Sequence, residues 1–84
     1  MRHVLYVELR GEDAARRLRP LLDDLARVPG FRGGELLRSP AQPGLALVQA
    51  RFDVEPPDVS LPGGARAWTF VVEHAHEAPH DPLE

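Results

Sequence analysis

Residues 3–28 decide the fold, and their sequence is HVLYVELRGEDAARRLRPLLDDLARV. Residues 3–10 are rich in strand formers and carry apolar side chains on both faces, which predicts a central strand covered on both sides. Gly11 to Asp13 then break the strand. Asp13 is a candidate N-cap, and its charge suits the N-terminus of a helix. The stretch therefore predicts a strand followed directly by a helix.

The predicted helix begins at Ala14 and extends to Val28, which makes about four turns. Its apolar residues recur at spacings of three and four, and most of its Arg and Asp residues fall on the other side. Pro20 removes one backbone hydrogen bond inside this helix, so we expect a kink there. A helix that starts at Pro20 is the alternative, but it would make Arg19 the N-cap, which is a poor capping residue.

Three further strands are expected after the helix. Residues 31–39 and 45–53 have strand character on either side of a Pro- and Gly-rich turn, which predicts a β-hairpin. Gly33-Gly34 indicates a bulge or a close approach of two backbones. Residues 54–66 hold too many Pro and Gly residues for a helix, and residues 67–76 form the last strand. The predicted fold class is α+β, with the order β-α-β-β-loop-β and one main helix.

The 84 residues allow a single domain, which we place at residues 1–76, with residues 77–84 as a flexible C-terminal tail. The chain has no Cys, which excludes disulfides, Cys-based zinc sites and a cysteine nucleophile. Its basic residues form no patch, so nucleic acid is not expected as a partner. No apolar run approaches the roughly 18 residues of a membrane span, and no secretory segment follows Met1, so we expect no membrane partner and a cytoplasmic location.

The first and last strands are apolar on both faces, yet one helix can cover only one face of a sheet. Leu5 and Val7 oppose Val4 and Tyr6 on the first strand, and Phe70 opposes Val71 on the last. The chain has no element left for the second face. A second copy of the sheet is the economical cover, so the sequence predicts a homodimer.

Three short segments resemble the antibiotic biosynthesis monooxygenase family: Val28-Pro29-Gly30-Phe31, residues 34–39 and residues 45–48. The resemblance covers residues 4–53, and residues 67–76 in pattern only. It implies a ferredoxin-like antiparallel sheet of the dimeric α/β-barrel superfamily. Relatives usually have a second helix before the last strand, so this chain resembles a shortened member.

Members of that family that act on aromatic polyketides are oxygenases without a cofactor, with an Asn and, four residues on, a Trp on the third strand. The matching positions here are Gln49 and Asp53. Gln can replace Asn as a hydrogen-bond donor to an oxyanion, whereas Asp cannot replace an aromatic residue. Haem-degrading relatives use a His on the second helix, which this chain lacks. The resemblance therefore implies no cofactor.

Gln49 and Arg51 are the candidate catalytic residues, because they share one strand face with Leu45 and Leu47 and could orient a substrate oxygen. The competing interpretation is that this strand emerges into solvent after Val48. Burying an unpaired guanidinium is costly, so we expect Arg51 to pair with Glu8 or Glu35 if no ligand is present.

Four residues are candidates for a substrate pocket: Tyr6 and Glu8 on the first strand, and Trp68 and Phe70 on the last. Tyr and Glu could do acid–base chemistry, and the aromatic pair would suit a planar ligand. Ordinary core or dimer packing is the competing interpretation. His74 and His76, followed by His80, are weak metal-ligand candidates, and we expect no physiological metal.

The leading functional prediction is a dimeric α/β-barrel protein that binds a small aromatic molecule, with oxidation of a phenolic or quinol compound without a cofactor as its catalytic form. The alternative is a non-catalytic ligand-binding or structural dimer. An apolar cavity with one or two polar groups would favour the oxygenase. A sheet face filled by its own side chains would favour the structural dimer.

Overall fold

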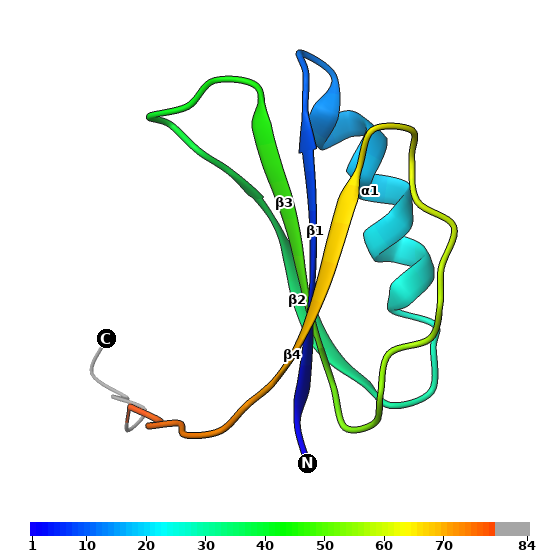
Figure 1. Cartoon of the computed structure of the whole chain (residues 1–84), viewed down its shortest axis with the longest axis vertical. Helices are drawn as coiled ribbons and strands as arrows, with labels where there is room; N and C mark the ends of the chain where they lie inside the picture. Colours follow the sequence, from blue (N-terminus) through cyan, green and yellow to red (C-terminus); the bar gives the residue numbers. More distant parts are fainter. Residues whose placement is uncertain (79–84) are drawn as a thin grey trace, which may run out of the picture.

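Four antiparallel strands form one open sheet, and a single helix packs against one of its faces (Figure 1). This computed structural model describes residues 1–78. The chain forms β1 (His3–Arg10), α1 (Ala14–Leu25), β2 (Phe31–Arg38), β3 (Leu45–Phe52) and β4 (Arg66–Val71). The predicted α+β class and the order β-α-β-β-loop-β are confirmed.

The strand order across the sheet is β2-β3-β1-β4, which is compatible with a ferredoxin-like fold. Both β1 and β3 have a neighbour on each side, so the prediction that residues 3–10 form a central strand is confirmed. In residues 1–78, no helix has both the length and the apolar composition that crossing a membrane requires.

The core lies between α1 and the sheet face that the helix covers. Alternate residues of β1 and β3 are buried there, as expected from the two-residue period of a strand. The helix contributes its own apolar stripe at spacings of three and four residues. The buried set is Leu5, Val7, Leu9, Ala14, Leu18, Leu21, Leu25, Ala46, Val48, Ala50 and Phe52.

The helix begins at Ala14 and contains Pro20, so the longer of the two predicted helices is confirmed at its start. It ends at Leu25, earlier than the expected Val28. Asp13 occupies the N-cap position, but its side chain makes no capping hydrogen bond. Its φ and ψ of −104° and 14° lie outside the extended region that capping residues favour, and its carboxylate lies 3.5 Å from the Arg16 guanidinium instead.

The predicted bulge in β2 is confirmed, because the pairing of β2 with β3 shifts register between Phe31 and Gly33. The close approach is also present. A Cβ atom on Gly34 would lie 2.6 Å from the backbone oxygen of Gln49, so only glycine fits here without displacing β3.

Residues 54–65 form no helix, as predicted, and carry Val59, Leu61 and Ala65 against the core. The loop runs beside α1 (Figure 1), and the Arg17 guanidinium donates a hydrogen bond of 3.0 Å to the carbonyl oxygen of Gly63.

The last strand is shorter than predicted, because β4 ends at Val71 and not at His76. His3 pairs with Val71, and the Val72 amide donates one more hydrogen bond to the carbonyl oxygen of Arg2. Residues 72–78 leave the sheet, on the side opposite to α1 (Figure 1).

Candidate functional site

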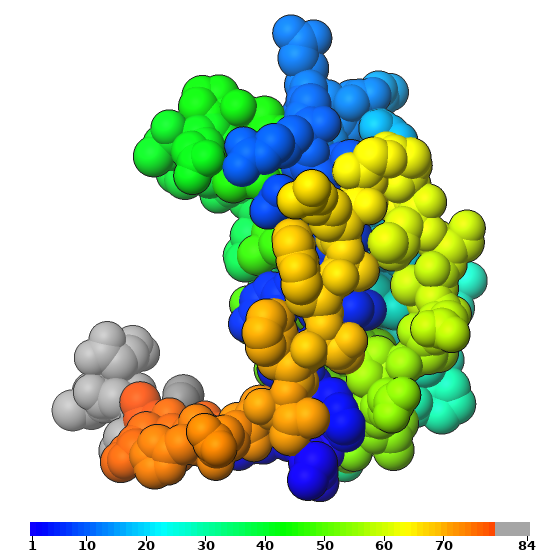
Figure 2. Space-filling view, viewed as in Figure 1, coloured from blue at the N-terminus to red at the C-terminus, as the bar shows by residue number. Residues whose placement is uncertain are grey.

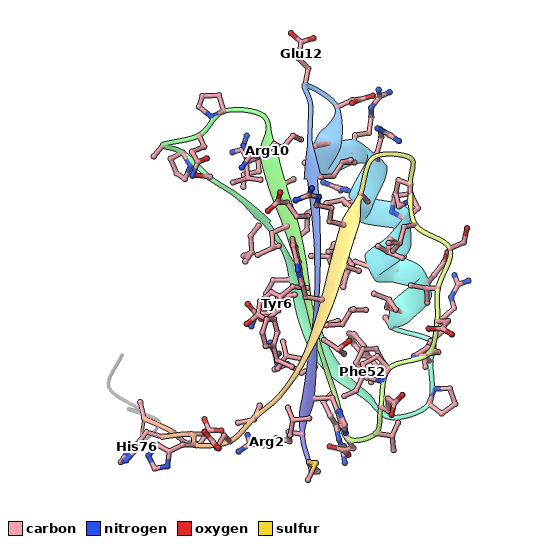
Figure 3. The ribbon with its side chains drawn as sticks, viewed as in Figure 1. Arg2, Tyr6, Arg10, Glu12, Phe52 and His76 are labelled. Carbon is pink, nitrogen blue, oxygen red and sulfur yellow. The ribbon has the colours of Figure 1, made fainter. Side chains whose placement is uncertain are left out.

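All six residues predicted for the site lie on the sheet face turned away from α1, which we call the open face. On β1 and β3 these residues alternate with buried ones, so their side chains point away from the core. On β4 every residue is exposed, and the register places Trp68 opposite Tyr6 and Phe70 opposite Val4 on the same face. Figure 3 shows this division: Tyr6 and Phe52 point to opposite sides of the sheet. The open face comprises Val4, Tyr6, Glu8 and Arg10 of β1, Glu35 and Leu37 of β2, Leu45, Leu47, Gln49 and Arg51 of β3, and Arg66, Trp68 and Phe70 of β4.

The strand register arranges these side chains in rows across the sheet. One row places Arg51, Val4 and Phe70 on adjacent strands. The next row places Gln49, Tyr6 and Trp68 on the same strands, and Glu35 extends it onto β2. Directly opposed side chains in a sheet lie about 4.5–5.5 Å apart at Cβ, so residues in one row can contact a common ligand.

An apolar groove of about 580 Å³ runs along the open face over β1 and β4. Tyr6, Trp68 and Phe70 line it, as predicted, and Tyr6 packs edge-to-face on Phe70 with ring centroids 5.5 Å apart. Figure 2 shows this side of the molecule hollowed between the β2–β3 turn and residues 72–78. The remaining lining residues are Val4, Leu47, Val71 and Val72.

The aromatic walls of this groove are only partly covered. Trp68 is 42% exposed and Phe70 is 55% exposed, although both are among the largest apolar side chains of the chain. Large apolar side chains that gather on one exposed surface are typical of an interaction or ligand site.

Arg51 pairs with Glu35, one of the two predicted carboxylates, through a hydrogen bond of 2.8 Å from its Nη1 atom to Oε1. Glu35 stands directly opposite Gln49, the strand neighbour of Arg51 on this face, so the two charges meet diagonally. Glu8 stands opposite Leu47, farther from Arg51 along the strand, and its carboxylate lies 3.7 Å from Arg10 instead.

Gln49 is half-buried beside the groove, on the strand next to Tyr6. Among the side-chain hydrogen bonds of residues 1–78, none involves the Gln49 amide or the Tyr6 hydroxyl. Both groups can therefore donate to or accept from a bound molecule. Gln49 and Arg51 do not line the groove itself; they lie next to it on the open face.

The remaining predicted residues do not join this arrangement. Glu8 shares the open face with Tyr6 but makes no hydrogen bond with it. His74 and His76 lie edge-to-face with ring centroids 5.5 Å apart on the segment after β4, so the prediction that they belong to the last strand is wrong. Within residues 1–78 no cluster of three or more His, Asp or Glu side chains is placed to hold a metal, and His80 lies outside the described residues.

Sequence reasoning missed Val4 and Leu47 as groove residues and treated Glu35 only as a partner for Arg51. For Val4 and Leu47 the alternation of side chains along a strand was a usable signal, because it places them on the same face as Tyr6 and Gln49. The strand order was also needed, since it brings β4 beside β1.

No family model matches this chain, and neither a curated protein nor a solved structure matches it. The resemblance to the monooxygenase family therefore stays a prediction.

Proposed function

We propose that two copies of this chain pack through their open faces into a dimeric α/β barrel that holds a small planar aromatic molecule. The uncovered groove between Tyr6, Trp68 and Phe70 carries this proposal. Fully burying a large apolar side chain stabilises a protein by about 1.5–3 kcal/mol relative to leaving it exposed. Covering the exposed parts of Trp68 and Phe70 would therefore favour association of two copies.

A second copy suits this face because its charges are mixed. Glu8 and Glu35 stand on the same surface as Arg10, Arg51 and Arg66. In a two-fold dimer the same patch meets itself, so a surface with one sign of charge would repel its copy. This surface has both signs, and its apolar centre lies over β1 and β4.

The ligand class follows from the side chains around the groove. Aromatic walls favour a flat, apolar ring system. The Gln49 amide and the Tyr6 hydroxyl have no partners within the described residues, so they can hydrogen-bond an oxygen of the ligand. A phenol combines both features.

Oxidation of such a phenol without a cofactor is the second candidate function, and the unpaired Gln49 amide favours it. With anthrone, whose enol is a phenol, the ring CH₂ carbon would lose two hydrogens and gain one oxygen atom of O₂. The second oxygen atom would leave as water, and the four electrons that reduce O₂ come from this carbon. Gln49 would donate a hydrogen bond to the enolate oxygen. Arg51 is less suited to this role, since Glu35 already binds it.

Light scattering and calorimetry test the leading proposal. We expect a dimer at micromolar concentration and saturable heat on titration with 2-naphthol. Trp68 is the single Trp of the chain, so its emission should shift to longer wavelength as dilution separates the copies and wets the groove. A monomer that binds no naphthol would refute the proposal, and a dimer that binds none would leave only a structural role.

A further inference from the structure

Arg51 and Glu35 form an ion pair on the open face, and a second contact restricts the position of the Arg51 guanidinium. Besides the 2.8 Å hydrogen bond, the guanidinium lies against the backbone of β2 at Gly33, where a Cβ atom would come within 2.5 Å of its Nη2 atom. A charge-assisted hydrogen bond and a flat backbone surface together restrict the guanidinium to one place. We call Glu35 and Arg51 the charge pair.

The charge pair lies beside the place where a ligand would rest. Arg51, Val4 and Phe70 occupy one row, and adjacent strands lie about 4.8 Å apart, so the row spans about 10 Å from β3 to β4. A two-ring aromatic molecule seated on Val4 and Phe70 would therefore direct one end toward β3. Glu35 borders that end from the next row, opposite Gln49.

The sign of the charge at that end depends on Glu35. Without its carboxylate, Arg51 would present an unpaired positive charge, which is a good site for a carboxylate ligand. With the carboxylate in place the pair is neutral, and an anionic ligand would meet like charge from Glu35. An uncharged hydroxyl suffers no such repulsion, and phenols stay protonated near pH 7 because their pKa is close to the value of about 10 of tyrosine.

We infer that Glu35 makes this site select uncharged aromatic alcohols over aromatic carboxylates. Glu35 is thus a specificity-determining residue that acts through the Arg51 guanidinium and by direct repulsion. This inference rests on the proposed function, because it needs a ligand in the groove.

Calorimetric titration of the full chain with 2-naphthol and with 2-naphthoate tests it, since the two probes share a ring system and differ in charge. The wild type should prefer 2-naphthol by about tenfold or more, which corresponds to about 1.4 kcal/mol. Glu35→Gln should raise the affinity for 2-naphthoate about tenfold and change that for 2-naphthol by less than about twofold. Arg51→Gln should bind 2-naphthoate more weakly than the wild type does, because it removes the positive charge and leaves the Glu35 carboxylate unpaired.

Asp53→Asn is the matched control. Asp53 is half-exposed and pairs with Arg32, so it resembles Glu35 in chemistry, but it lies beyond the end of β3 and its carboxylate does not pair with Arg51. It should leave both affinities unchanged. Equal wild-type affinity for the two probes would overturn the inference while leaving the proposed function intact, whereas binding of neither probe would overturn both. If Glu35→Gln does not fold, Glu35→Ala takes its place, and an unchanged 2-naphthoate affinity in the folded variant would overturn the inference.

Discussion

Arg51 lies over Gly33, so closely that a Cβ atom on Gly33 would come within 2.5 Å of the guanidinium. Gly33 has a φ of 151°, a conformation that residues with a side chain rarely adopt. Gly33 is therefore needed for two features: the register shift in β2, and the close contact of the Arg51 guanidinium with β2 where it binds Glu35.

Gly33→Ala should destabilise the protein by about 1–3 kcal/mol, the usual range for a strained backbone conformation. Urea unfolding followed by circular dichroism measures this. Gly63→Ala is the control, because its Cβ atom would meet only the Arg17 guanidinium at an ordinary 3.8 Å. Equal unfolding free energies for the two variants would show that Gly33 is not strained.

Phe70→Asp should weaken the dimer at least about tenfold, since it places a charge in the apolar groove where the second copy is expected to pack. Sedimentation equilibrium measures the dissociation constant. Val54→Asp is matched in exposure, 51% against 55%, but Val54 does not line the groove. A Phe70→Asp protein that dimerises as well as the wild type would contradict packing through the open face.

Pro20→Ala should stabilise the protein by about 1–3 kcal/mol, because proline in a helix interior costs about 3 kcal/mol relative to alanine. Pro20 is exposed, so the change loses no core packing, and it restores a backbone donor to α1. Thermal unfolding reports the effect. Arg19→Ala, at the exposed neighbouring position, should change the melting temperature little. A lower melting temperature for Pro20→Ala would mean that the ring makes contacts that stabilise the fold.

Gln49→Ala tests the oxygenase candidate. Loss of one donor to an oxyanion typically lowers the rate about 10²–10³-fold, so anthraquinone formation from anthrone should fall to near the uncatalysed rate. Gln42→Ala, on the exposed β2–β3 turn, should leave the rate unchanged. If the wild type itself forms no anthraquinone above background, the catalytic candidate fails while ligand binding stands.

The elements of this fold follow from local pattern. Apolar spacing placed α1, and two-residue alternation put Gln49 and Arg51 on one face, because successive side chains of a strand must point to opposite sides. Breakers in residues 54–65 excluded a second helix, since proline there removes backbone donors. These features needed no knowledge of which strands are neighbours.

The tertiary structure decided what pairing and register control. Arg51 binds Glu35 and not Glu8 because the pairing of β2 with β3 sets Glu35 diagonally beside it. The last strand ends at Val71 because β1 begins at His3, so His74 and His76 lose the strand geometry that their own sequence favours. Each outcome depends on a partner strand distant in the chain, and a local pattern carries no information about where that partner begins.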